Sequence, residues 1–148
     1  LLSSIVLTTV NPARMKSRNA RRKSDMNQLR IALEFFYDTN SAYPSTGGAW
    51  FSSEPGDSNG SNNGGNWIPG LAPQFIAGLP RDPLGGSLAC PTATGLRAYL
   101  YRSDGANYKL LSHCNPEGSS NLSDPFYDSI RPTWAWMVCS GPPACGTW

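Results

Sequence analysis

The sequence predicts an α+β domain in which one long amino-terminal helix packs on a small antiparallel sheet. Apolar residues recur at helical spacing up to the Tyr-Pro pair at residues 43–44. Residues 97–114 and 133–139 instead carry the alternation and the aromatic content of strands. A helix followed by a run of strands, rather than a repeated alternation of the two, indicates an α+β arrangement. The 148 residues are enough for one domain with one modest core.

The first ten residues, LLSSIVLTTV, are mostly apolar and lead into Asn11-Pro12. A helix of about 39 residues beginning here would be about 60 Å long, at about 1.5 Å per residue. A small domain cannot cover that length, so we expect the surplus to contact other chains or lipid; an ordinary buried helix end is the alternative. The stretch is shorter than the roughly 20 residues that span a bilayer, and it lacks the basic region and the cleavage site of a complete signal peptide. We therefore expect it to be the carboxyl-terminal half of a longer apolar helix that begins before residue 1.

The net charge of +2 hides an uneven distribution, because seven of the twelve basic residues lie between residues 14 and 30 and no acid precedes Asp25. Such a stretch can face anionic lipid headgroups, nucleic acid or the acids of a neighbouring subunit. Next to an apolar segment, the flank of a membrane-embedded helix is the favoured interpretation. The residues of this basic stretch are Arg14, Lys16, Arg18, Arg21, Arg22 and Lys23.

The second half of the helix is expected to bury one apolar stripe, because six side chains fall within one arc of a helical wheel. Ile31 and Phe35 lie nearly opposite this stripe, and we expect a loop of the same chain to cover them, or else a neighbouring subunit. Pro12 is predicted to kink or locally melt the helix, and Tyr43-Pro44 to end it. The stripe consists of Met26, Leu29, Ala32, Leu33, Phe36 and Tyr37.

The remainder of the chain divides into loops and strands. Residues 45–66 are rich in Gly, Ser and Asn and predict a surface loop, anchored by Trp50 and Phe51. Residues 97–114 predict an antiparallel hairpin that turns at residues 103–106. The segment TWAWMVC, residues 133–139, predicts a third strand with three side chains on one side, namely Trp134, Trp136 and Val138.

All four cysteines lie in the carboxyl-terminal half, and their even number in a sparsely charged chain favours disulfides and an oxidising compartment. Zinc bound by these cysteines and His113 is the alternative, but the Cys-x2-Cys pair of structural zinc sites is absent. Four cysteines allow three pairings. We favour Cys139–Cys145, which closes a short loop, and Cys90–Cys114, which ties a loop to a strand end.

Several segments of the chain together resemble a known protein family. The apolar stretch followed by SRNARRKSDMNQLRIALEFFYDTNSAYPST is similar to the amino-terminal helix of type IV pilins and of type II secretion pseudopilins. The segments WIPGL…LPRDPLGG and YLYRSDGANYKLLS resemble head-domain segments of the major pseudopilins. The likeness runs in order along nearly the whole chain and is strongest over residues 17–46 and 79–111. The phenylalanine-led apolar run with its glutamate, which begins the family's processed helix, is absent and is expected to precede Leu1.

The resemblance implies a pilin fold and a structural role. Residues 1–24 would form an exposed filament-core half of the helix, and residues 25–148 the head. The chain would be the major pilin of a cell-surface filament of identical subunits, held in the inner membrane before a pilus or secretion machinery assembles it. The resemblance assigns the filament core to Leu1, Leu2, Ile5, Val6, Leu7 and Val10, with Pro12 as the site of melting. Basic residues pairing with an acid of the next subunit would be Arg14, Arg18, Arg21, Arg22 and Lys23.

Two alternatives to a surface filament remain open at this stage. One is a type II secretion pseudopilin that drives protein secretion. The other is an uptake or adhesion pilin that binds DNA or glycans through the basic stretch and through exposed rings, although most of these rings are expected in the core. The aromatic candidates are Trp50, Trp67, Trp134 and Trp148.

The resemblance also raises calcium as a cofactor, because some pseudopilins bind it in the loop after the hairpin. The hard oxygen ligands there are Glu117, Asp124 and Asp128, with Ser119 and Asn121 nearby. Ordinary solvated loop acids are the alternative. No other cofactor is expected.

No enzyme motif is present in the sequence: it has no Walker loop, no G-x-S-x-G and no His-Glu metal pair. His113, the one histidine, adjoins Cys114 and is expected to be a surface residue at a strand end. We therefore expect no enzymatic activity.

Overall fold

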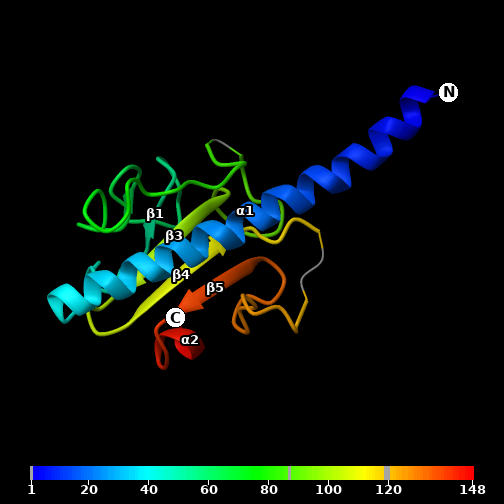
Figure 1. Ribbon diagram of the computed structural model, residues 1–148. Helices are drawn as coiled ribbons and strands as arrows, with labels where there is room; N and C mark the ends of the chain where they lie inside the picture. The colour runs from blue at the N-terminus through cyan, green and yellow to red at the C-terminus, as the bar shows by residue number, and fades with distance from the viewer. Residues whose placement is uncertain (1, 87, 119–120) are drawn as a thin grey trace.

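A 39-residue helix lies along one face of a five-stranded sheet in the computed structural model (Figure 1). The structure describes residues 2–86, 88–118 and 121–148, without the side chains of residues 2–10 and 63. The α+β arrangement expected from the sequence is confirmed. The elements are α1 (Leu2–Asn40), β1 (Phe51–Ser52), β2 (Asn62–Asn63), β3 (Ala98–Ser103), β4 (Tyr108–His113), β5 (Ala135–Cys139) and α2 (Ala144–Thr147).

Four of the six residues in the predicted core stripe of α1 are buried, Phe36 is partly buried, and Tyr37 is exposed. Met26, Leu29 and Leu33 are fully buried against the sheet, as their spacing of three and four residues requires. Tyr37 is 39% exposed instead. It lies one helical turn beyond Leu33, where the sheet no longer covers the helix, and its ring lies against Tyr43 at 4.7 Å between centroids.

Two proline-based expectations about the helix, that it melts at Pro12 and that it ends at Tyr43-Pro44, need correction. The helix continues through Pro12 without interruption, so the chain is not melted there; the cost of about 3 kcal/mol for an internal proline does not unwind the flanking turns. The helix ends at Asn40, before Tyr43-Pro44. Ser41 adopts a left-handed backbone with φ of 57°, and its N–H donates to the carbonyl of Tyr37 at 2.7 Å, which is a common way of ending a helix.

The sheet has the strand order β2-β1-β3-β4-β5 and is antiparallel except for the short parallel pair β1–β2. The predicted hairpin is confirmed as β3–β4, with Ala98 opposite His113 and Ser103 opposite Tyr108. The Asp104 carboxylate closes the turn by accepting from the N–H groups of Ala106 and Asn107 at 2.9 and 2.7 Å. Residues 45–66 are more ordered than a surface loop, because β1 pairs with β3 and Ser52, like its neighbours, is buried.

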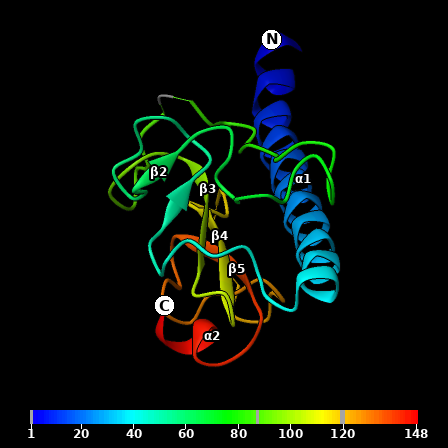
Figure 2. The same cartoon turned by 90° about the vertical axis from the view of Figure 1, so that its left-hand side faces the viewer.

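Alternate residues of the strands serve two separate apolar clusters. Tyr99, Tyr101 and Leu110 face α1, whereas Leu100 and Leu111 face the opposite side, which we call the outer face. Figure 2 shows α1 along one side of β3, β4 and β5. The expectation that Trp134 shares a side with Trp136 is wrong: Trp134 precedes the first residue of β5 and packs on the outer face.

The two favoured disulfides are confirmed. Cys90 bonds Cys114 and Cys139 bonds Cys145, with Cα–Cα distances of 5.5 and 5.4 Å. The cysteines are thus not zinc ligands. Cys90–Cys114 ties the loop before β3 to the residue after β4, and each bond stabilises the fold by about 2–4 kcal/mol.

Candidate functional site

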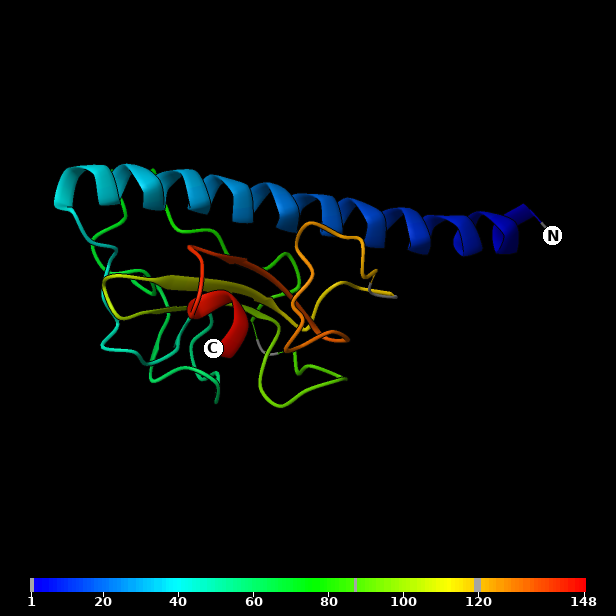
Figure 3. The ribbon, with the colours of Figure 1, turned by 90° about the horizontal axis from the view of Figure 1, so that it is seen from below.

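The amino-terminal part of α1 extends beyond the head. Figures 1 and 3 show the dark blue end of the helix continuing past the sheet and its loops. The side chains from Asn11 to Arg14 are exposed. Within the part of the chain that the structure describes, the first hydrogen bonds between the helix and the head are those of Arg18 and Asn19.

The predicted filament-core residues fall largely outside the description. Leu1 lies outside the described residues, and no side chain is described for Leu2, Ile5, Val6, Leu7 or Val10. Pro12 is exposed. A search of the described helices finds none that is long and apolar enough to cross a membrane.

Arg22 forms the centre of an ion-pair cluster between α1 and the head. Its side chain is 0% exposed, and its Nε and Nη2 donate to the two oxygens of Asp82 at 2.7 and 2.9 Å. Its Nη1 donates to Glu117 at 2.6 Å. The Asp82 carboxylate also accepts from the backbone N–H of Leu84 and from the amide of Asn115. A buried arginine is tolerated here because its planar guanidinium group donates hydrogen bonds to acceptors on each of its edges.

Arg18 lies one turn before Arg22 on the same side of α1, and both reach Glu117. Arg18 donates to the two Glu117 oxygens at 2.7 and 2.5 Å. Asn19 exchanges hydrogen bonds with the backbone of Glu117 at 3.0 and 3.2 Å. The hydrogen bonds from Arg18, supported by those from Arg22, lower the pKa of Glu117 from 4.5 to about 2.

Lys23 forms a third anchor. Its Nζ lies 2.5 Å from a carboxylate oxygen of Asp124 and 4.7 Å from the ring centroid of Trp136. The ammonium group is therefore held by an opposite charge and by an aromatic face together.

These contacts change the predicted role of the basic stretch. Arg18, Arg22 and Lys23 are engaged inside the chain, and Arg22 is not accessible to a neighbouring subunit. Arg21 is 62% exposed and lies 3.8 Å from Asp25, which makes a weak pair. Arg14 and Lys16 are exposed, and among the described residues neither forms an ion pair.

The predicted calcium ligands do not converge. Glu117 binds Arg18 and Arg22, and Asp124 binds Lys23. Asp128 is buried and contacts Lys109 and Arg131 at 3.2 and 3.3 Å. Cations from α1, from β4 and from the turn before β5 thus occupy these acids. Ser119 lies outside the described residues. Over residues 2–86, 88–118 and 121–148 no group of three acidic, His or Cys side chains is placed to hold a metal ion.

A second surface of α1 is apolar and open. Ile31 is 52% exposed and Phe35 is 59% exposed, so the expectation that a loop of the same chain covers them is wrong. The pair is therefore available to another molecule.

Tryptophan and arginine side chains alternate on the outer face of the sheet. The Arg131 guanidinium lies 5.4 Å from the ring of Trp50 and 5.7 Å from that of Trp134, while Arg102 lies 5.9 Å from Trp50 and 4.8 Å from Trp148. These three tryptophans are half-buried. Trp67, by contrast, is 1% exposed and belongs to the core, so the expectation that most of the four rings are buried holds for Trp67 alone.

His113 is not the surface residue that the sequence predicts. It is 2% exposed, its ring meets Trp134 edge-on at 5.2 Å between centroids, and its Nδ1 lies 2.8 Å from the carbonyl oxygen of Leu96. Burial lowers the pKa of His113. The loop at residues 92–96 covers the end of β4, and nothing in the local pattern around His113 indicates that cover.

Sequence reasoning missed Asp82, Asn19 and Asn115. Asp82 lies in the segment PRDP, where flanking prolines restrict the backbone. A carboxylate on such a rigid turn is held in one position, and this could have marked Asp82 as a candidate ion-pair partner. The pairing with Arg22 spans 60 residues, and no local pattern predicts it.

We expect the head to lose stability in acid through Glu117. Because the folded state holds the pKa of this carboxyl at about 2 instead of 4.5, its stabilisation is complete above about pH 4.5 and is lost as the pH falls towards 2. Urea unfolding between about pH 5 and about pH 3 measures this loss. Glu117→Gln should flatten the dependence in that range, whereas Asp38→Asn, at an exposed position of α1, should leave it unchanged; equal slopes for all three proteins would contradict the prediction.

No protein-family model matches the chain, and no curated protein and no solved structure matches it significantly. Any statement of function therefore rests on this chain's own residues and contacts.

Proposed function

We propose that the chain is the structural subunit of an extracellular, type IV pilus-like filament that assembles through the amino-terminal half of α1. The observation that carries the proposal is the helix that continues past its own head (Figure 3), with an apolar sequence at its free end. Burying that stretch between copies would stabilise the assembly by about 25 cal/mol per Å2 of apolar area. Because each subunit has several neighbours in such a filament, the sum of these individually ordinary contacts would give a strong polymer.

The contacts between α1 and the head support a helix whose first half assembles the filament and whose second half carries the head. The ion-pair cluster at Arg18, Arg22 and Lys23 attaches the head to the helix near the point where the helix leaves it. The exposed pair Ile31 and Phe35 offers a further apolar surface to a neighbouring head. Arg14 and Lys16 remain available to form ion pairs with an acidic residue of the next subunit. Such exposed ion pairs would make assembly sensitive to salt. Before assembly, the apolar half would lie in the inner membrane.

Ile5→Asp tests the proposal. A charge in the apolar stretch should abolish filaments, because an unpaired carboxylate cannot be buried between helices. The head should remain folded, since among the described residues its hydrogen bonds to the helix begin only at Arg18. Electron microscopy of sheared cell-surface material detects the filaments, and circular dichroism of the purified chain reports the fold.

Ile5→Leu is the matched control, because it keeps the apolar character and should leave filaments intact. Normal filaments from Ile5→Asp, or a full-length chain that stays solitary at high concentration without detergent, would refute the proposal.

A type II secretion pseudopilin is the second candidate, favoured by the resemblance of WIPGL…LPRDPLGG and of the β3–β4 segment to major pseudopilins. In that role Ile5→Asp would block the secretion of other proteins, with few or no surface filaments in the unmodified cells. A DNA-binding role has less support, because Arg18, Arg22 and Lys23 already pair within the chain.

A further inference from the structure

A cavity of about 320 Å3 opens on the outer face of the sheet, away from α1. Its floor is formed by Leu100 and Leu111, which are almost fully buried. Trp50 and Trp134 line it together with Asn59, Thr92 and Thr94. A cavity of this size that combines apolar and aromatic side chains with polar ones has the composition of a small-molecule site.

The two tryptophan rings are held in place by packing on the outer apolar cluster and by an arginine. The Arg131 guanidinium lies between them, at 5.4 Å from Trp50 and 5.7 Å from Trp134. Arg131 is itself fixed, because its Nη1 donates to the carbonyl of Trp148 at 2.8 Å and lies 3.3 Å from Asp128. Cation–π contacts of this kind orient a ring while leaving part of it uncovered.

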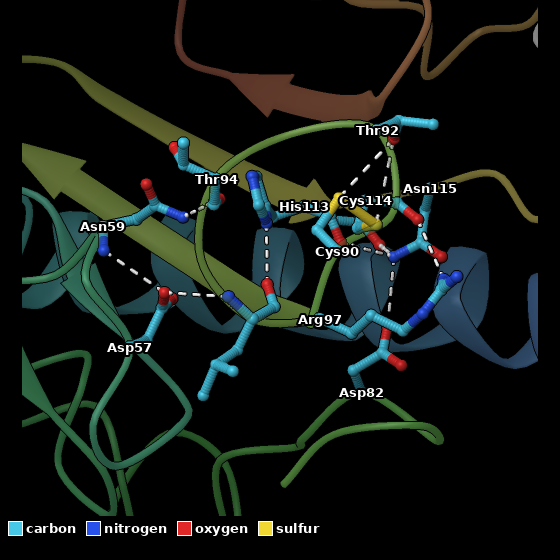
Figure 4. Close-up of a disulfide and its surroundings, with 12 residues drawn as sticks. Asp57, Asn59, Asp82, Cys90, Thr92, Thr94, Arg97, His113, Cys114 and Asn115 are labelled. Atoms are coloured by element: carbon cyan, nitrogen blue, oxygen red, sulfur yellow. Dashed lines mark hydrogen bonds between the residues drawn. A yellow bond between two sulfur atoms is a disulfide. The ribbon is translucent and has the colours of Figure 1, made fainter. Parts of the chain in front are cut away.

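His113 brings a hydrogen-bond acceptor to the cavity that it lines. A carbonyl oxygen only accepts, so the Nδ1 of His113 must carry the proton that it shares with Leu96. Burial lowers the pKa of the ring and so favours its neutral form, in which Nε2 is an acceptor. Figure 4 shows this second nitrogen of His113 directed towards the side on which Thr92 and Thr94 lie. No hydrogen bond to Nε2 is found among the described residues.

The rim of the cavity is rigid. The Asn59 amide donates to the carbonyl of Thr94 at 2.8 Å, and Asp57 accepts from the N–H groups of Asn59 and Leu96 (Figure 4). The disulfide Cys90–Cys114 closes the same loop. Gly95 has φ of 88°, and a Cβ there would collide with Asn59 and Asp57. A preformed rim lowers the entropic cost of binding.

We infer that this cavity binds the pyranose ring of a saccharide. Such a ring has an apolar C–H face, which fits the flat faces of Trp50 and Trp134, and hydroxyls at its edge, which fit the acceptor on His113 and the hydroxyls of Thr92 and Thr94. Among the described residues that line the cavity, the only Lys or Arg is Arg131, which contacts Asp128, and this disfavours a phosphate-rich ligand. The inference is independent of filament assembly, since none of these residues lies on α1.

Saturation-transfer NMR of the full chain with glucose, galactose, mannose and N-acetylglucosamine tests the inference. At least one sugar should show transfer to its ring C–H protons, with a dissociation constant in the millimolar range. Trp134→Ala should weaken this binding about ten-fold, a loss of about 1.4 kcal/mol, and Thr92→Val should weaken it less without disturbing the fold, because Thr92 is exposed. Trp148→Ala, a half-buried ring outside the cavity, should leave it unchanged.

Several results would overturn the inference: no transfer to any of the four sugars at tens of millimolar, binding that neither Trp134→Ala nor Thr92→Val weakens, or preferential binding of tryptophan amide or of a DNA oligonucleotide. Electron microscopy should show normal filaments for Trp134→Ala and Thr92→Val. A loss of sugar binding with normal filaments therefore distinguishes this inference from the assembly proposal.

Discussion

Arg22→Met should destabilise the protein by about 3–5 kcal/mol, because it breaks a buried ion pair and leaves one partner without its counter-charge. Glu117 would keep Arg18, so the uncompensated charge is that of Asp82. That carboxylate is fully buried and would retain the N–H of Leu84 and the amide of Asn115 as donors. Urea unfolding measures the loss as a lower midpoint at an unchanged slope.

Two further variants separate the charge effect from lost packing. Adding Asp82→Asn to Arg22→Met removes the orphaned charge, so the double variant should be more stable than the sum of the single effects predicts. Arg14→Met removes a basic residue that is exposed and should change stability by less than about 0.5 kcal/mol. An Arg22→Met protein within about 1 kcal/mol of the unmodified one would contradict the prediction.

Trp67→Ala should cost about 3–5 kcal/mol, the usual range for a buried tryptophan. Its side chain is 1% exposed, in the core between α1 and the sheet, with its ring 6.2 Å from that of Tyr99. Removing it leaves a cavity that the fixed strands cannot fill. The same denaturation measurement reports the loss.

Trp67→Phe provides the matched comparison. It retains much of the packing and removes an indole N–H that has no hydrogen-bond partner in the described part of the structure, so it should cost clearly less than Trp67→Ala. Trp148→Ala should cost little, because that ring is only half-buried. If Trp67→Ala and Trp148→Ala were equally destabilising, Trp67 would not be the core residue described here.

The ion-pair cluster links these stability effects to the proposed assembly. Asp82 comes from the connection before β3, and Glu117 and Asp124 come from the connection between β4 and β5; all three bind α1 between residues 18 and 23. They therefore set where the head sits on the helix, whose amino-terminal end continues past the head (Figure 3). A head attached at one fixed place would repeat with one geometry in every copy of a helical filament.

The sequence by itself determined the helix with its buried Met26, Leu29 and Leu33 and the β3–β4 hairpin, and it favoured the observed disulfides over two other pairings. The helix follows from a period of 3.6 residues and the hairpin from a period of two with a turn, whereas the bond Cys90–Cys114 joins residues 24 positions apart. Tertiary structure alone decided the pairing of Arg22 with Asp82 and Glu117, across 60 and 95 residues. It also decided the burial of His113, the outer position of Trp134 and the exposure of Ile31 and Phe35. The physical reason is that local periodicity specifies which face of an element is apolar, whereas the partner of a charge depends on which loops the packed core brings beside it.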